Sequence, residues 1–382
     1  MTPVVPAATA PSPASPSTAR ALNDRLALRL LQDEGPLTAT QLKALTGLSR
    51  PSVADLVERL AAAGLIEVVG ESGEQRRGPN ARVYGIVAHR AHLAALDVRT
   101  DSAMAVVTDL LGRVVAEAEL PVDAPRAAVS ELLRVARAAG AAELHTVVVG
   151  APGLVAPATG ELRDTSGLPA WHRELVAVLQ RELPARVLVE NETNLAAVAE
   201  QRVGAARDLD SFVLLWLGAG VGAAVVLDGR LRRGASGGAG EIGFLPVPGT
   251  GGLPSATDCG GGFHALVGRE AVAALAAGSG FAGPVEEAVA GAAGPAFLDA
   301  LAERLALGAA AVAAVLDPGC VVLGGGLGLA GGPPLAARVA DRLRTLTPVP
   351  TEVRATTLGD GAVLEGARLA GRDAAQEAVF GG

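Results

Sequence analysis

Residues 37–66 read LTATQLKALTGLSRPSVADLVERLAAAGLI, a stretch with two short amphipathic segments separated by a Thr-Gly-Leu turn. Intervals of three and four between the apolar residues gather them on one inward face of each predicted helix. These residues are Leu42, Leu45, Val53, Leu56, Val57 and Leu60. Ser49 suits the N-cap of the second helix, because its hydroxyl can accept a hydrogen bond from a free backbone N–H. The stretch predicts a helix-turn-helix; an αα-hairpin without a role at DNA is the alternative.

The outward face of the second helix carries small or polar side chains that can contact base edges and phosphates. They are Arg50, Ser52, Ala54, Asp55 and Arg59. A β-hairpin is predicted next, with strands at residues 65–69 and 83–87 around a turn-rich stretch. We expect its arginines to meet phosphates beside the groove, although a solvated basic loop is the alternative. These arginines are Arg76, Arg77 and Arg82.

A further helix over residues 23–34 completes the pattern, so residues 20–90 are predicted to form a winged helix-turn-helix domain that binds double-stranded DNA. Residues 1–19, rich in Pro, Ala and Ser, are predicted to be a disordered tail rather than a signal peptide. The chain has a formal net charge of -8. Residues 20–90 nevertheless hold ten basic against eight acidic side chains. The acidic remainder should therefore confine DNA contact to the N-terminal domain.

Length and composition predict two or three globular domains for 382 residues, half of them hydrophobic. No run of about twenty apolar residues free of turn-formers predicts a membrane span. The only cysteines are Cys259 and Cys320, which provide no disulfide framework and fit a reducing cytoplasm. We therefore expect a cytoplasmic protein.

From residue 91 onward, predicted strands alternate with predicted helices. Three strands, a helix and a buried strand are expected at residues 92–97, 103–109, 114–120, 127–139 and 145–151. A similar series follows, with strands at 212–217 and 221–227, a helix at 296–316 and a buried strand at 320–323 that ends in Gly324 and Gly325. Two such halves predict a two-lobed α/β domain with a cleft between the lobes, over residues 91–382.

Several blocks in this region occur in an order that is typical of one family. They read LDVRTD (96–101), GAPGLV (150–155), VENETNLAAVAE (189–200), LGAGVGAAVVLDGRLRRGASGGAGEIGF (217–244), DCGGGFHAL (258–266) and VVLGGGL (321–327). With the preceding winged helix, the chain resembles the ROK family of repressors and sugar kinases. The resemblance implies an actin-like, ribonuclease-H-like duplicated fold, whose kinase members bind ATP and a hexose. Its repressors carry an added winged helix, and the departures of this chain from the kinase motifs place it in the repressor branch.

The nucleotide site implied by the resemblance is degenerate at its first turn. Family kinases have Asp-Gly-Gly-Thr there, because glycine lets backbone N–H groups approach phosphate. Here Asp97 is followed by Val98 and Arg99. The second turn keeps its glycines and has Ala219 in place of a threonine, and a tight hairpin without phosphate is the alternative. The remaining glycines of this degenerate site are Gly218, Gly220, Gly222, Gly324 and Gly325.

The catalytic base and the metal site of the family are also altered. Glu192 stands where the kinases have an aspartate, and its extra methylene misplaces the carboxylate on a scale that can cost about a hundredfold in rate. We therefore expect no catalytic residue and no enzymatic activity. Of the family's zinc ligands, Phe244 and Thr257 replace two and Cys259 remains, with His264 nearby. We expect no bound metal and no cofactor.

By the same resemblance, an effector would contact Asn191, Glu192 and Glu241, whose side chains can each bond two neighbouring hydroxyls. A sugar derivative, another ligand or an empty remnant of the site are left as alternatives. The sequence thus predicts a transcriptional regulator of the ROK type, a homo-dimer or homo-tetramer, with a former kinase domain that senses a sugar-like effector. A divergent ATP-dependent sugar kinase with a DNA module is the main rival, and a scaffold without a working site is the third reading.

Overall fold

The computed structural model describes residues 16–72, 80–163, 169–255 and 261–381. The chain divides into two compact units. The first comprises the residues up to Ala91 together with 109–111 and 374–382, and the second comprises 92–108 and 112–373. Among the described helices, none combines the length and the apolar character that a membrane crossing needs.

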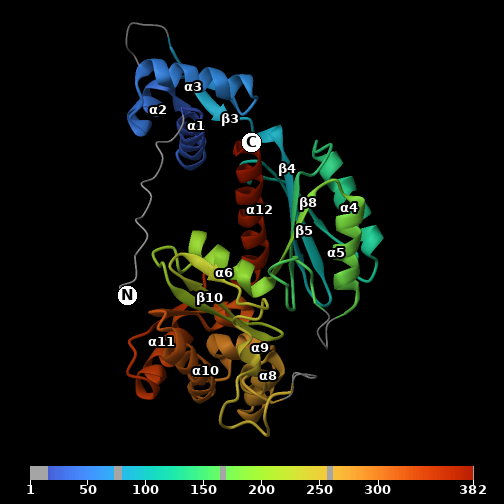
Figure 1. The fold of residues 1–382 in the computed structure, drawn as a ribbon. Helices are drawn as coiled ribbons and strands as arrows, with labels where there is room; N and C mark the ends of the chain where they lie inside the picture. Colours follow the sequence, from blue (N-terminus) through green and yellow to red (C-terminus); the bar gives the residue numbers. More distant parts are fainter. Residues whose placement is uncertain (1–15, 73–79, 164–168, 256–260, 382) are drawn as a thin grey trace, which may run out of the picture. The chain divides into compact units, whose positions relative to one another are not determined.

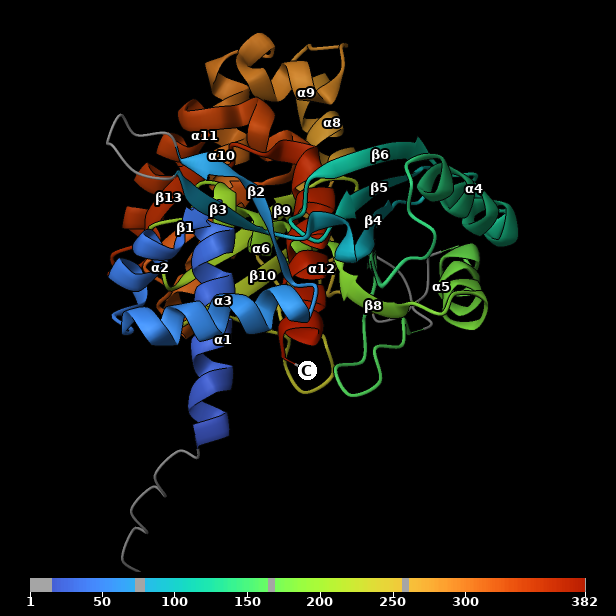
Figure 2. The same ribbon diagram turned by 90° about the horizontal axis from the view of Figure 1, so that it is seen from above.

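The first unit has the predicted winged helix-turn-helix (Figures 1 and 2). Its elements are α1 (Pro16–Asp33), β1 (Leu37–Thr38), α2 (Ala39–Thr46), α3 (Arg50–Ala62), β2 (Ile66–Ser72), β3 (Ala81–Ile86) and the 3-10 turn η1 (Ala88–Arg90). The strands form an antiparallel sheet in the order β1-β3-β2. A bulge between Val68 and Gly70 shifts the register of the wing.

Two details of this unit differ from the sequence prediction. Leu45 was assigned to the inward face, but 49% of it is exposed, whereas the other five predicted core residues are buried. Because α2 is only two turns long and ends at Gly47 in the left-handed region, its last turn leaves Leu45 at the surface. In addition, α1 begins at Pro16, within the predicted disordered tail, because proline is compatible with the first turn of a helix and Ala-rich residues continue it.

The chain's end completes the first unit. Gln376 donates from Nε2 to the side chain of Gln32 at 2.7 Å and to the carbonyl oxygen of Leu110 at 2.9 Å. Ala375 and Leu110 are fully buried. Residues 374–382 therefore belong to the first unit, a connection over more than 340 residues that the sequence pattern did not predict.

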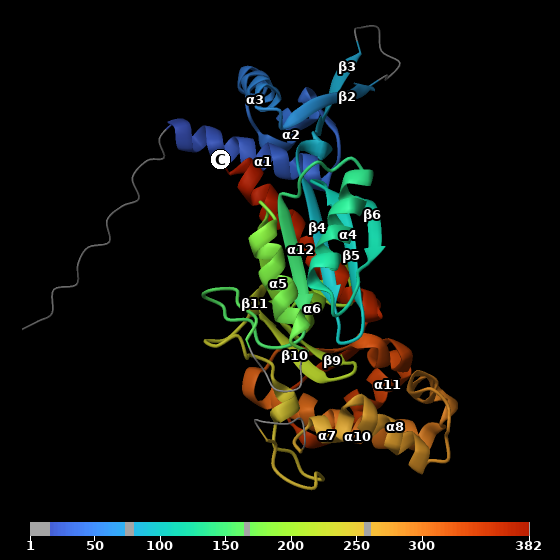
Figure 3. The ribbon, with the colours of Figure 1, turned by 90° about the vertical axis from the view of Figure 1, so that its right-hand side faces the viewer.

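The second unit is a duplicated α/β domain, as predicted. The N-terminal lobe has a five-stranded sheet in the order β6-β5-β4-β7-β8. Its elements are β4 (His92–Val98), β5 (Ala103–Asp109), β6 (Val114–Glu119), α4 (Pro125–Ala138), β7 (Thr146–Ala151), α5 (Trp171–Glu182) and β8 (Arg186–Asn191). β4, β7 and β8 run parallel, and α4 and α5 cover the outer face of the sheet (Figure 3).

The C-terminal lobe repeats this order as β11-β10-β9-β12-β13. Its strands are β9 (Phe212–Leu217), β10 (Val221–Leu227), β11 (Arg230–Arg232), β12 (Cys320–Gly324) and β13 (Glu352–Ala355). Its helices are η2 (Ile242–Phe244), α7 (His264–Val267), α8 (Arg269–Gly278), α9 (Val285–Glu287), the π-helical turn η3 (Ala288–Ala292), α10 (Pro295–Leu316), α11 (Gly325–Leu346) and η4 (Gly359–Gly361).

Two helices, α6 (Glu192–Val203) and α12 (Ala362–Phe380), follow the last strand of each lobe. Alanines and a few larger residues of both helices pack between the two sheets in one hydrophobic core. This core includes Ala95 and Val148 of one sheet and Phe212 and Val322 of the other. Because α6 starts directly at the end of β8, the packing fixes the position of Asn191 and Glu192 at the junction of the lobes.

Candidate functional site

The first turn of α3 is organised by its N-cap. The hydroxyl of Ser49 accepts from the backbone N–H of Ser52 at 3.3 Å, and the two serine hydroxyls lie 2.8 Å apart. The side chain of Ser52 is therefore committed to the cap, although it is exposed. Arg50 is exposed beside it and has no hydrogen-bonding partner among the described residues. Its guanidinium is thus available to an external ligand.

Arg59 has intramolecular partners instead. Its Nη2 donates to Oδ1 of Asp24 in α1 at 2.6 Å, and its Nη1 pairs with Asp55 one turn earlier on α3. About a third of the side chain is exposed. The bond to Asp24 joins α3 to α1. Arg59 therefore stabilises the position of α3, the helix that the sequence predicts to contact DNA.

The wing lies beside α3 as a two-stranded arm (Figure 3). Arg82 is exposed on β3, opposite Glu71 of β2. Arg76 and Arg77 lie outside the described residues. Of the predicted DNA contacts that the structure describes, Arg50 and Arg82 are therefore the exposed basic residues.

In the second unit, Arg99 fills the turn between β4 and β5, where the sequence predicts the first turn of a degenerate nucleotide site. Its Nε and Nη2 donate to Oδ2 of Asp97 at 3.0 and 2.9 Å, and Nη2 also donates to the carbonyl oxygen of Asp360 at 2.8 Å. Asp97 is 5% exposed. Burial raises the pKa of its carboxyl, and the charge of Arg99 opposes that shift. The turn therefore holds the guanidinium of Arg99 at the place where the family's kinases offer backbone N–H groups to phosphate.

His172, in α5, contacts the backbone of this turn. It is 1% exposed, and its Nε2 lies 3.0 Å from the carbonyl oxygen of Arg99. Burial lowers the pKa of the imidazole. The neutral ring with its proton on Nε2 can donate to Arg99. Nδ1 has no partner among the described residues.

The backbone of the turn between β9 and β10 does not require glycine. Gly218, Gly220 and Gly222 have no positive φ, and a Cβ on Gly220 would meet open space. Gly325 differs, with a φ of +75° and only 2.5 Å between an added Cβ and the carbonyl oxygen of Leu217. Gly324, the last residue of β12, is buried.

The predicted effector contacts gather where α6 begins. Asn191 caps the helix, because its Oδ1 accepts from the backbone N–H groups of Thr193 at 2.9 Å and Asn194 at 3.3 Å. Its Nδ2 donates to the carbonyl oxygen of Gly153 at 3.0 Å. The Asn191 amide is thus largely occupied by partners within the protein.

Glu192 carries the strongest electrostatic perturbation of the site. Its pKa is raised to about 7, first by burial and then by the neighbouring charges of Asp97 and Glu241, while Arg99 acts in the opposite direction. Burial also raises the pKa of Glu241. The structure therefore brings Glu192, Glu241 and the Arg99 turn together. Near neutral pH, Glu192 can donate or accept a hydrogen bond.

The region that corresponds to the family's zinc site is described only in part. Phe244 ends η2 and is 42% exposed, and His264 begins α7. Thr257 and Cys259 lie outside the described residues. Within the described ranges, no three His, Cys, Asp or Glu side chains are grouped to hold a metal ion.

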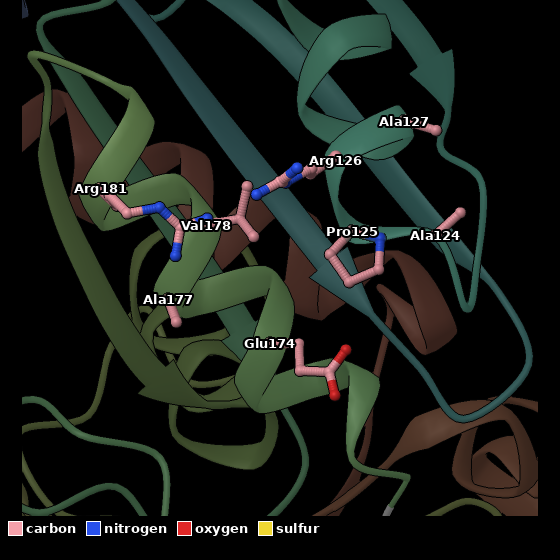
Figure 4. Close-up of a pocket in the computed structure, with 8 residues that line it drawn as sticks. All are labelled: Ala124, Pro125, Arg126, Ala127, Glu174, Ala177, Val178 and Arg181. Atoms are coloured by element: carbon pink, nitrogen blue, oxygen red, sulfur yellow. The ribbon is translucent and has the colours of Figure 1, made fainter.

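A separate hollow of about 440 Å³ lies between α4 and α5, on the outer face of the N-terminal lobe (Figure 4). Arg126 and Arg181 line it together with Glu174, and both arginines approach Glu182, at 3.7 and 3.2 Å. None of the predicted effector contacts lines this hollow, so the predicted sugar site is elsewhere.

Sequence reasoning missed three residues near these groups: Glu190, which accepts from Nε of Arg233 at 2.6 Å, Arg233 itself, and Asp360. Glu190 and Arg233 lie inside the blocks that carry the family resemblance, but their interaction depends on the folded chain. The carbonyl oxygen of Asp360 accepts from Arg99, and a backbone acceptor of this kind leaves no signal in a sequence.

Two family models match the chain. The ROK family matches residues 93–373, nearly the whole of the second unit. The MarR family matches residues 22–78, from α1 into the wing. Among curated relatives, the transcriptional dual regulator NagC of Escherichia coli (strain K12) is 28% identical over 236 residues, which are 59% of this chain and 57% of NagC.

The bifunctional enzyme NanE/NanK of Brucella suis is 39% identical over 160 residues, 39% of this chain and 28% of that enzyme. The chain thus spans a little over half of NagC and less of NanE/NanK. Of the solved structures, a ROK family transcriptional regulator titled as a homolog of the E. coli MLC protein has a TM-score of 0.75 at 20% identity, over 95% of this chain and 98% of that one. A ROK hexokinase from Thermus thermophilus has a TM-score of 0.61 at 26% identity, over 75% and 99%.

Proposed function

Because this chain belongs to the ROK family, we propose that it is a DNA-binding transcriptional regulator, acting in the cytoplasm, whose sugar-kinase-type domain senses a sugar-like effector. The observation that carries the regulator role is the winged helix-turn-helix in the first unit, with a capped recognition helix and an exposed Arg50. The similarity to the regulator NagC supports the same role.

The DNA interface consists of the first turn of α3 and the wing. Arg50 reads a base edge, with guanine as the expected partner because guanidinium matches its two acceptors. Ser52 bonds a phosphate or base edge once it leaves its cap partner. Arg82, with Arg76 and Arg77, binds phosphates. Arg59 acts indirectly, by holding α3 on α1.

The protein works as a homo-dimer or homo-tetramer. A single helix-turn-helix reads only a few base pairs, and pairing two half-sites about one DNA turn apart supplies affinity and length of site. The sign of regulation in this proposal is repression, as in the repressor branch of the family.

The effector binds between the lobes, where Glu192 and Glu241 offer hydrogen bonds to neighbouring hydroxyls and Asn191 offers the remaining N–H of its amide. A ligand that contacts both lobes favours their closed state only by its differential affinity for that state. The resulting change in operator affinity is expected to be about five- to 150-fold.

Phosphoryl transfer is not part of this function. Arg99 occupies the first phosphate turn through its bonds to Asp97 and Asp360, and the altered base Glu192 sits where an aspartate is expected. The divergent kinase is the second candidate, and the similarity to the enzyme NanE/NanK favours it. A coupled assay with ATP and a hexose panel decides between them: turnover that Glu192→Ala abolishes contradicts the regulator-only function.

DNA binding is tested with the full chain in gel shifts. Arg50→Ala is expected to lower the preference at one base pair by about 1–3 kcal/mol. The double variant Arg76→Ala, Arg77→Ala is expected to weaken binding to every sequence and to flatten its salt dependence. Unchanged DNA affinity in both variants contradicts the interface.

Metal analysis of the purified protein tests the proposed absence of structural zinc. We expect no zinc, because Phe244 supplies no ligand at the histidine position. Zinc near one equivalent per chain, retained through dialysis against a mild chelator, would show that other residues replace the lost ligands.

A further inference from the structure

A short series of hydrogen bonds joins the two lobes where α6 begins. Arg233, in the loop after β11 of the C-terminal lobe, donates from Nε to Oε2 of Glu190 at 2.6 Å. Glu190 lies in β8 of the N-terminal lobe, and its other oxygen accepts from the backbone N–H of Asn191 at 3.0 Å and from Nδ2 of Asn194 at 2.8 Å. Both oxygens of this carboxylate are therefore engaged, and the side chain is only 12% exposed.

Asn191 links Glu190 to the first turn of α6. Its Oδ1 caps the first turn of α6, and its Nδ2 holds the loop after β7 through the carbonyl oxygen of Gly153. Glu192 is the first residue of that turn. The direction in which Glu192 enters the cleft thus depends on a cap whose own backbone N–H is held by Glu190.

The loop that carries Arg233 lies tightly against the N-terminal lobe. Gly237 has a φ of +87°, and a Cβ there would lie 2.0 Å from the carbonyl oxygen of Val155. The same loop continues to Glu241, the effector contact of the C-terminal lobe. Only glycine permits this approach of two backbones, so the close approach and the ion pair both hold this loop against the N-terminal lobe.

We infer that Arg233 is the positioning residue of the effector site: by holding Glu190 across the two lobes, it fixes the start of α6 and so orients Asn191 and Glu192 for the ligand. The inference rests on the proposed effector function. Separation of the lobes breaks the Arg233–Glu190 pair, which frees Glu190 and loosens the cap. A ligand that contacts Glu192 and Glu241 therefore selects the same closed state that this pair stabilises.

The neighbouring residue provides a matched control. Arg232 is 44% exposed and bonds to Asp228 and to the carbonyl oxygen of Leu227, all within the β10–β11 hairpin. Arg232→Ala removes the same side chain and charge one position away without touching the other lobe. The test variant is Arg233→Ala, and Arg233→Lys keeps the charge while losing the planar donor group.

Amide hydrogen exchange of the ligand-free full chain measures directly how strongly the start of α6 is held in place. We expect Arg233→Ala to speed amide exchange in the peptide spanning 186–194 by about three- to tenfold, the size expected for a half-exposed ion pair. Arg232→Ala should leave that peptide unchanged, and Arg233→Lys should restore part of the protection. Equal exchange in wild type and Arg233→Ala overturns the inference.

Calorimetry with a hexose and hexosamine panel then measures the affinity of the protein for each sugar. Arg233→Ala should weaken whichever sugar the wild type binds by about three- to tenfold, with Arg232→Ala unaffected. Undiminished affinity in Arg233→Ala overturns the positioning role. If the wild type binds no sugar, the proposed effector function fails, whereas the exchange measurement still decides whether Arg233 orders the start of α6.

Discussion

The two lobes of the second unit share a strand order but differ at the turn between their first two strands. In the N-terminal lobe, the β4–β5 turn is filled by the side chain of Arg99, which bonds to Asp97 and to Asp360. In the C-terminal lobe, the β9–β10 turn keeps Gly218 and Gly220; a Cβ on Gly218 would lie 3.0 Å from Nε1 of Trp216, whereas one on Gly220 would meet open space. The comparison shows that a duplicated scaffold can keep one strand order while a side chain fills the turn in one lobe and glycines remain in the turn of the other.

The glycines that both lobes keep serve the fold. After the inner parallel strand of each lobe, one glycine has a positive φ: Gly153 at +101° after β7 and Gly325 at +75° after β12. These positions need glycine for the backbone, whereas Gly220 does not. Substitution by alanine can therefore distinguish glycines that the backbone conformation requires from glycines that it does not require.

The largest expected effect is that of Gly325→Ala. Its Cβ would meet the carbonyl oxygen of Leu217 in a conformation that L residues rarely adopt, so the free energy of unfolding should fall by about 2–4 kcal/mol. The control Gly220→Ala should change it by no more than about 0.5 kcal/mol. Urea unfolding of both variants measures the difference; equal losses would contradict the division between the two kinds of glycine.

The second expected effect is a pH dependence from Glu192. Its pKa in the folded protein is about 7 against an ordinary 4.5, so its contribution to stability is fully present below pH 4.5 and is lost as the pH rises through 7. Relative to Glu192→Gln, the wild type should lose about 1–3 kcal/mol of unfolding free energy between pH 4.5 and 8. Urea titrations at a series of pH values measure this.

Glu117, exposed on β6, provides the control variant Glu117→Gln. It should give a difference from wild type that is nearly constant with pH. A flat difference for Glu192→Gln as well would mean that the carboxyl is not enclosed among Asp97 and Glu241 as the structure describes.

The third effect concerns the filled turn. Arg99→Ala leaves the buried Asp97 without its cation and should lower the free energy of unfolding by about 1–2 kcal/mol at neutral pH. The loss of Arg99 also removes the charge that opposes the raised pKa of Asp97, so stability should decline as the pH rises through that pKa and the cost should vanish in acid. Arg232→Ala, from an exposed pair, is the control. A cost independent of pH would contradict the Asp97–Arg99 pairing.

Much of the fold was predictable because periodic burial is a local signal. The strands at 103–109, 212–217 and 221–227 begin and end where the sequence predicted, since each is bounded by turn residues. The helix-turn-helix followed from its apolar spacing and from the N-cap Ser49. Leu45 was misassigned because a two-turn helix has too few residues for spacing to define its buried face.

The site was less predictable, because its chemistry depends on residues far apart in the chain. The sequence showed that Arg99 interrupts a glycine turn but not that it bonds to Asp360. It placed Arg59 on the DNA-facing side without indicating Asp24 as a partner. The role of residues 374–382 in the first unit was equally hidden, because no local pattern connects Gln376 with Gln32.

The central claim, that the chain is a transcriptional regulator whose DNA binding responds to a sugar-like effector, is tested most directly by footprinting the full chain on DNA upstream of its own and neighbouring genes. We predict a protected segment with two half-sites about one DNA turn apart, roughly 34 Å, and protection that changes when an effective sugar is added. No protection beyond that of unrelated DNA, at a protein concentration that saturates non-specific binding, would contradict the account.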